Sequence, residues 1–218
     1  MSLHLQRDLE ALKKEVLQLG NLVESAINTA ILSLNNREAD LADKVMQYEE
    51  EINNKEVYIE EECLKILALH QPVAVDLRFI VVVLKVNNDL ERMGDFAKNI
   101  AKRAIFLAAK PPVPVFEEFT AELPVMVRSM VRKSLDALVT LDVELARSVI
   151  DMDDRVDELN IRMYAEVHRI INEDASKSEV AINMLSTSRY MERIADLSTN
   201  IAEDVMFMVE GRVVRHID

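Results

Sequence analysis

Two segments of the chain share an unusual arrangement of acidic residues. DLERMGDFAKNIA and YMERIADLSTNIA lie 101 positions apart, and in each a glutamate precedes an aspartate by four residues, with an asparagine four residues further on. The residues concerned are Glu91, Asp95 and Asn99 in the first segment and Glu192, Asp196 and Asn200 in the second. Side chains four residues apart on a helix are neighbours, so each acid pair costs roughly a few tenths of a kcal/mol. The recurrence of a costly pair makes a cation-binding site one interpretation of these segments.

The donor atoms in these segments are hard oxygens. Carboxylates and asparagine amides suit magnesium, calcium, manganese or iron, with zinc as a further candidate, and neither segment contains a histidine or a cysteine. A third acid pair, Asp153 and Asp157, is expected on the helix that packs beside the second segment. The simpler interpretation is a solvated charged face, which is the usual role of acidic runs. Both interpretations stay open at this point.

The composition is that of an acidic, helical protein. Half of the 218 residues are hydrophobic, and only three glycines and five prolines interrupt the chain. The net charge of −13 argues against nucleic acid or anionic lipid as a partner and favours cations or basic partners.

We expect a soluble cytoplasmic protein without membrane insertion. The single cysteine, Cys63, excludes an internal disulfide and fits a reducing compartment. The start of the chain lacks the apolar core of a signal peptide, and the apolar run FIVVVL is too short to span a bilayer.

Hydrophobic periodicity predicts six long helices, arranged as a tandem duplication of one three-helix unit. The apolar stripe of the second helix recurs 104 positions later in the fifth, so that Val45, Tyr48, Ile52, Ile59, Cys63 and Ile66 correspond to Val149, Met152, Val156, Met163, Val167 and Ile170. The Pro-rich stretch KPPVPVF separates the two copies. We predict an all-α fold of two tandem homologous three-helix bundles in up-down order, over residues 1–109 and 110–218, with helices of about 30 residues.

The same periodicity assigns a direction to the acids. At about 100° per residue, the apolar residues of each segment gather on the side of the bundle core, and the acids fall on the opposite side. We therefore expect the carboxylates on an open surface of each bundle. Gly94 and Ala195, at equivalent positions, should allow a neighbouring helix to approach closely, and Pro124 should kink or delay the fourth helix.

The segment QPVAVDLRFIVVVLKVNNDLERMGDFAKNIA, Gln71 to Ala101, closely resembles the signature of the PhoU family of phosphate-system regulators. EEEIN, Glu49 to Asn53, and DDRVD, Asp153 to Asp157, resemble the acidic motif on that family's middle helix. With the duplication and the Pro-rich join, the resemblance covers nearly the whole chain. It implies two three-helix bundles, often in a homodimer, with multinuclear metal clusters on the acidic surfaces of some members.

Carried over to this sequence, the resemblance implies that nine residues hold metal: Glu49, Glu91, Asp95, Asn99, Asp153, Asp157, Glu192, Asp196 and Asn200. The ions would be iron, zinc, manganese or magnesium. The first copy departs from the second, because Asn53 stands where the second has Asp157 and leaves the first cluster poorer in charge.

The resemblance also implies a function. It is that of a cytoplasmic negative regulator of phosphate uptake and of phosphate-responsive genes. The partners would be the ATPase subunit of the phosphate ABC transporter and a phosphate-sensing histidine kinase.

Three classes of function compete. The sequence favours a regulatory binding protein over an enzyme, since it offers no nucleophile beside a base, no phosphate-binding glycine loop and no cofactor motif. A ferritin-like metalloenzyme would need Glu-x-x-His motifs directed into the bundle, and neither His70 nor His168 has a glutamate three residues earlier. The third class is a purely structural helical dimer whose acidic stripe only keeps it in solution.

Overall fold

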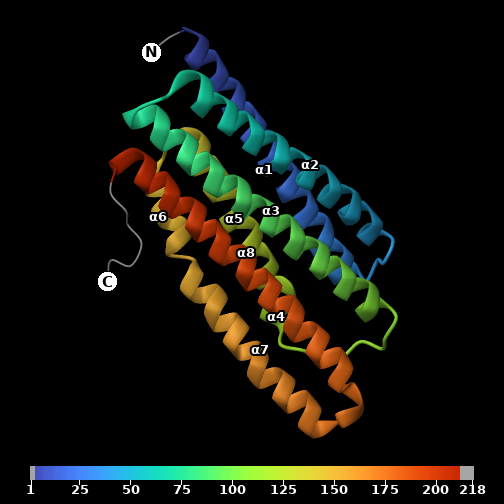
Figure 1. The fold of residues 1–218 in the computed structure, drawn as a ribbon. Coiled ribbons are helices and arrows are strands. Elements are labelled where there is room, and N and C mark those ends of the chain that lie inside the picture. Colours follow the sequence, from blue (N-terminus) through green and yellow to red (C-terminus); the bar gives the residue numbers. More distant parts are fainter. Residues whose placement is uncertain (1–2, 212–218) are drawn as a thin grey trace.

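The protein is a bundle of long helices lying side by side (Figure 1). The computed structural model describes residues 3–211, and within this range there is no β-strand, so the all-α prediction is confirmed. The elements are α1 (Leu3–Asn36), α2 (Leu41–His70), α3 (Ala74–Ala108), α4 (Glu117–Ala121), α5 (Leu123–Thr140), α6 (Val143–Ile150), α7 (Asp153–Glu173), the 3-10 turn η1 (Ala175–Lys177) and α8 (Ser178–Glu210).

The first bundle consists of α1, α2 and α3, which pack against one another along their lengths. The helix α2 ends at a left-handed residue, Gln71, whose backbone N–H donates to the Leu67 carbonyl, and Pro72 follows where a helix cannot continue. The predicted apolar stripe of α2 faces the core. Its residues Val45, Ile52, Ile59, Cys63 and Ile66 are all buried, and Tyr48 is partly buried.

The second bundle repeats this arrangement, but two of its helices are broken. The predicted fourth helix appears as α4 and α5, with Pro124 in the first turn of α5, as expected. The predicted fifth helix is divided, because a tight turn at Asp151 and Met152 separates α6 from α7. In this turn the Met152 N–H donates to the Val149 carbonyl.

The sequence at this break explains it. The segment DMDD contains three aspartates, which are poor residues for the interior of a helix but favourable in its first turn, where they meet the positive end of the helix dipole. The chain therefore starts a new helix at Asp153, with Asp153 and Asp154 in its first turn. The break fixes where the acids of α7 point.

Helices α3 and α8 join the two bundles. They run antiparallel, as Figure 1 shows. Three contacts follow the interface: Lys85 Nζ to Asp204 Oδ1 at 2.9 Å, the stacked rings of Phe96 and Tyr190 at 6.0 Å, and Arg103 Nη1 to Asn183 Oδ1 at 3.0 Å. Because buried residues of both bundles form one continuous core, the division at residues 109 and 110 stays a prediction.

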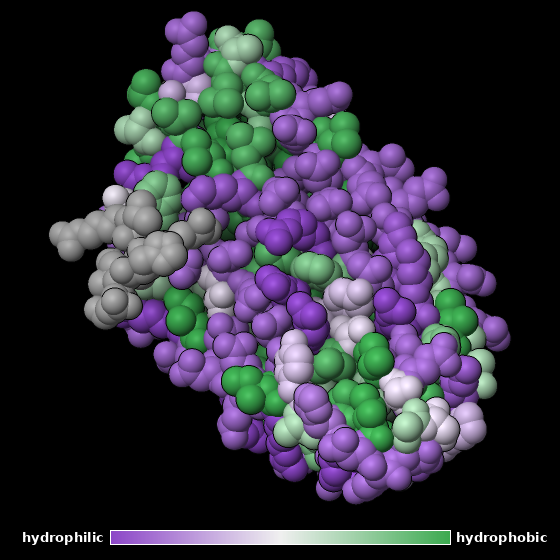
Figure 2. Space-filling model, turned by 60° about the horizontal axis from the view of Figure 1, so that its bottom comes forward, coloured by the Kyte–Doolittle hydropathy of each residue, from purple (hydrophilic) through white to green (hydrophobic). Residues whose placement is uncertain are grey.

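The surface is mostly polar, with apolar areas at its ends (Figure 2). Exposed apolar residues occur at the turn between α2 and α3, where Leu69, Val73 and Val75 all protrude. None of the helices between residues 3 and 211 is both long and apolar enough to cross a membrane.

Gly94 allows α2 to pack closely against α3, as the sequence predicted. A Cβ atom at this position would lie 3.0 Å from Ile52 Cδ1 and 3.2 Å from Ile52 Cγ2. The second copy has an alanine, Ala195, at the matching place, and there the residue that corresponds to Ile52 is the smaller Val156. The two copies therefore fill the same space with different pairs of side chains.

This exchange predicts a coupling between the two positions. Gly94→Ala should gain helix propensity but crowd Ile52, whereas Gly94→Ala combined with Ile52→Val should relieve the crowding. In a double-mutant cycle measured by chemical denaturation, the pair should be more stable than the sum of the single changes by roughly 0.5–1 kcal/mol. Additive free energies of unfolding would show that Gly94 has no packing role.

Candidate functional site

Three carboxylates meet between α7 and α8 in the second bundle. Asp157 of α7 approaches Glu192 and Asp196 of α8, and one carboxylate oxygen of each lies within 4.8 Å of the other two. Glu192 and Asp196 share a face of α8 because they are one turn apart. The sequence placed these residues on facing helices, and the structure brings them together.

These acids are less exposed than the helical wheel suggested. The side chains of Glu192 and Asp196 are 22% and 39% exposed, and Asp157 is exposed. The expectation of an entirely open acidic surface is therefore wrong for Glu192 and Asp196, because α7 packs along this side of α8. The cluster lies between the two helices, and Asp157 is its exposed member.

Asp153 adds a fourth carboxylate to this surface. It lies one turn before Asp157 on α7, and its Oδ1 is buried without a hydrogen-bond partner among the described residues. Burial, together with the charges of Asp157 and Asp196, raises the pKa of Asp153 to about 6. A bound cation would lower the cost of keeping this carboxylate ionised.

The pKa values of the other two partly buried acids are raised as well. Burial is the largest cause for both Glu192 and Asp196; the Asp196 charge adds to the effect on Glu192, and Arg193 opposes it on Asp196. Arg193 gives only weak compensation, since its Nε is 3.7 Å from Glu192 Oε2, its Nη1 is 4.0 Å from Asp196 Oδ2, and its side chain is half exposed. Four oxygen-donor side chains with little internal counter-charge fit a hard metal cation.

The first bundle carries the matching acids in a different electrostatic state. Glu49 of α2 accepts hydrogen bonds from Lys98 Nζ at 2.7 Å and from Asn53 Nδ2 at 2.8 Å. Burial favours the neutral form of Glu49, but the hydrogen bonds from Lys98 and Asn53 outweigh it and lower its pKa. Glu49 corresponds to Asp153, so the two copies shift the pKa of equivalent acids in opposite directions.

Glu91 and Asp95 complete this set on α3. Glu91 is partly buried and Asp95 exposed, and burial followed by the Asp95 charge raises the pKa of Glu91. Within residues 3–211 the acids of the first bundle do not gather as closely as Asp157, Glu192 and Asp196 do.

Lys98 is the residue that sequence reasoning missed. At an offset of 101 positions it corresponds to Thr199, so that aligning the two acidic segments would have revealed it. The predicted amide ligands, Asn99 and Asn200, lie partly buried one turn after Asp95 and Asp196. In the described part of the chain, no hydrogen bond joins either amide to the acids, and the role of all nine predicted residues as metal ligands stays a prediction.

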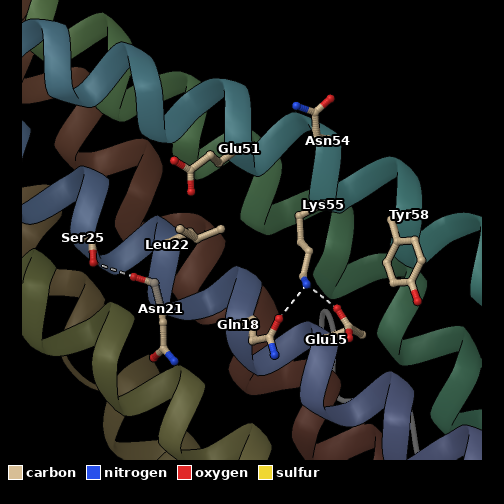
Figure 3. A pocket seen from close by; sticks show the side chains of 9 residues that line it. All are labelled: Glu15, Gln18, Asn21, Leu22, Ser25, Glu51, Asn54, Lys55 and Tyr58. Carbon is tan, nitrogen blue, oxygen red and sulfur yellow. Dashed lines mark hydrogen bonds and ion pairs between the residues drawn. The ribbon is translucent and has the colours of Figure 1, made fainter.

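A separate groove runs between α1 and α2 on the first bundle (Figure 3). In Figure 3 the side chain of Lys55 points from α2 towards α1, where it pairs with Glu15 and donates to Gln18 Oε1 at 2.7 Å. The nine lining residues are Glu15, Gln18, Asn21, Leu22, Ser25, Glu51, Asn54, Lys55 and Tyr58. None of the nine is a histidine or a cysteine, and none is among the predicted metal ligands, although Glu51 belongs to the EEEIN motif.

Matched substitutions of Asp153 and Glu49 should have opposite effects on stability. At pH 7 in chelator, Asp153→Asn should raise the free energy of unfolding by about 0.5–1 kcal/mol, because it removes a crowded charge, while Glu49→Gln should lower it by about 1 kcal/mol, because it breaks the pair with Lys98. Chemical denaturation measures both changes. Effects of the same sign would contradict the contrast between the two clusters.

The Asp153 effect should depend on pH. The pKa of this acid is about 6 in the folded protein, against 3.8 for an unperturbed aspartate, so its ionised form costs stability above pH 6, and the cost fades as it takes up a proton in the folded state. The advantage of Asp153→Asn should therefore shrink as the pH falls through 6. A constant advantage from pH 8 to pH 5 would contradict the raised pKa.

Comparison with known proteins extends these observations. A model of the PhoU domain matches the chain twice, over residues 16–104 and 121–205. The phosphate-specific transport system accessory protein PhoU homolog of Aquifex aeolicus is 38% identical over 212 residues, which cover 96% of this chain and 95% of the relative. The homolog of Pseudomonas aeruginosa is 37% identical over 210 residues, covering 96% of this chain and 87% of the relative.

Solved structures give the same result. The crystal structure of PhoU from Pseudomonas aeruginosa matches with a TM-score of 0.92 and 36% identity, over 95% of this chain and 99% of that chain. The phosphate transport system regulatory protein PhoU from Streptococcus pneumoniae matches with a TM-score of 0.83 and 27% identity, over 96% and 99%. Sequence, duplication and fold agree, and the chain belongs to the PhoU family.

Proposed function

We propose that this protein is a regulatory accessory protein of a phosphate transport system, acting in the cytoplasm by binding rather than catalysis. The relatives from Aquifex aeolicus and Pseudomonas aeruginosa carry the name of phosphate-specific transport system accessory proteins and match this chain almost from end to end. Within residues 3–211 the one close group of acids is that of Asp157, Glu192 and Asp196 between α7 and α8, and it includes no histidine or cysteine.

The proposed partners are the ATPase subunit of the phosphate ABC transporter and a phosphate-sensing histidine kinase, with a homodimer as the assembled form. The net charge of −13 and the acidic faces of both bundles favour contact with basic surfaces. Charge complementarity of this kind mainly raises the association rate and the specificity, and it weakens with salt.

We further propose that the α7–α8 cluster binds a metal cation, with iron, zinc, manganese and magnesium as candidates and room for more than one ion across four carboxylates. The observation that supports this most directly is the approach of Asp157, Glu192 and Asp196 within 4.8 Å. When bound, the ion would neutralise acids that otherwise repel one another. Asp157, Glu192 and Asp196 would hold it, and Asp153 would supply the neighbouring oxygen.

The alternatives receive less support. A ferritin-like enzyme places its ligands inside the bundle, whereas Asp157 is exposed and Glu192 and Asp196 are only partly buried. A purely structural dimer would leave the crowded acids with only the weak compensation that Arg193 gives.

Metal binding should depend on the second bundle. Protein purified without chelator should lose bound metal when Asp157→Asn, Glu192→Gln and Asp196→Asn are combined, because the close oxygen ligands are removed. Elemental analysis by plasma mass spectrometry measures the loss. The matched control, Glu50→Gln with Glu60→Gln and Glu61→Gln on exposed positions of α2, removes equal charge and should keep the metal. Equal metal contents in the two variants would contradict the proposed metal site between α7 and α8.

Regulation should depend on the acidic stripes. Replacing Glu91, Asp95, Glu192 and Asp196 by Gln and Asn should leave the fold intact, since none is a core residue. Phosphate-responsive genes should then be expressed even when phosphate is plentiful, as a reporter gene would show. A folded variant that keeps full repression and unchanged binding to the transporter ATPase and the kinase would show that docking uses another surface.

A further inference from the structure

The two copies of the acidic motif differ at the positions that decide their charge, and the geometry points to a different cation partner for each copy. We infer that the ammonium group of Lys98 takes the place of a metal ion among the acids of the first bundle. The protein then takes up metal only in the second bundle. The metal class, a hard divalent cation, is taken from the proposed function on which this inference rests.

The ion pair of Lys98 is well placed for this role. Its Nζ lies 2.7 Å from Glu49 Oε1, and the two side chains are only 28% and 13% exposed. On α3, Lys98 follows Asp95 by three residues and Glu91 by seven, so all three share one face of the helix. The ammonium group therefore interacts electrostatically with acids from both α2 and α3.

Asn53 strengthens the same arrangement. Its amide Nδ2 donates to the Glu49 oxygen that also accepts from Lys98, at 2.8 Å. An N–H donor directed at this oxygen competes with a metal for its lone pairs. The corresponding residue of the second copy, Asp157, is instead one of the three closely spaced acids.

The charge balance of the two clusters differs accordingly. The second bundle brings four carboxylates together between α7 and α8 and has Thr199 in place of the lysine. In the first bundle Glu49, Glu91 and Asp95 are joined by Glu56, whose charge also acts on Glu91, and Lys98 pairs directly with Glu49. A metal entering the first bundle would have to displace an ammonium group from a hydrogen bond of 2.7 Å, whereas in the second bundle it meets only the longer contacts of Arg193, at 3.7 Å to Glu192 and 4.0 Å to Asp196.

The sequence of the protein itself supplies the test. The starting variant removes the second cluster by Asp157→Asn, Glu192→Gln and Asp196→Asn. Asn53→Asp and Lys98→Thr are then added, which give the first bundle the residues of the second copy. Binding of Mn²⁺ is measured by equilibrium dialysis with elemental analysis, and folding by circular dichroism.

The starting variant should bind no Mn²⁺ above background. The added pair should create Mn²⁺ binding that is at least about tenfold tighter than this background. A control pair at exposed positions, Lys14→Thr with Asn54→Asp, makes the same change in net charge and should create none. If the starting variant keeps Mn²⁺ that Glu49→Gln removes, or if the folded five-fold variant binds none, the inference is overturned.

This design separates the inference from the proposed function. If the natural protein takes up no metal but the five-fold variant does, metal binding in the second bundle fails while the role of Lys98 stands. The reciprocal change, Asp157→Asn with Thr199→Lys in the otherwise natural chain, should abolish Mn²⁺ uptake without loss of helix content. Retained uptake in that variant would overturn the view that a lysine at this position excludes metal.

Discussion

Two carboxylates one turn apart on a helix repel each other, and the matching acidic segments of the two bundles each contain such a pair, Glu91 with Asp95 and Glu192 with Asp196. The acidic surfaces depend on how that repulsion is offset. In the first bundle Lys98 provides the opposite charge from within the chain, at 2.7 Å from Glu49. In the second bundle Arg193 reaches Glu192 only at 3.7 Å and Asp196 only at 4.0 Å, and the pKa values of Asp153, Glu192 and Asp196 are raised. The same motif therefore has one form with a close internal ion pair and one form with only long contacts to a half-exposed arginine.

The fold places the acids where this difference matters. The packing of α3 against α8 joins the bundles through one core and holds both acidic helices in the middle of the molecule. The break between α6 and α7 puts Asp153 at the start of a helix, one turn before Asp157, so that both acids lie on the side facing α8. The positive end of the α7 dipole eases the charge of Asp153, but the acid remains crowded.

Much of this architecture is readable from the sequence. The apolar stripe from Val45 to Ile66, its repeat and the position of Pro124 predicted the elements, because burial imposes the helical period on the chain. The break at Asp151 was not predicted, since an apolar stripe continues across it. The partial burial of Glu192 was also missed, because a helical wheel does not contain the neighbouring helix. Lys98 was missed because the two segments were matched by the residues that they share, and at this position they differ.

The most direct measurement is the anomalous diffraction of crystals grown with Mn²⁺. We expect an anomalous peak bounded by Asp157, Glu192 and Asp196, with the Lys98 ammonium still paired to Glu49 and no peak beside it. An anomalous peak at Glu49, Glu91 and Asp95 with Lys98 displaced, or crystals whose second cluster stays without an ion at saturating Mn²⁺, would contradict it.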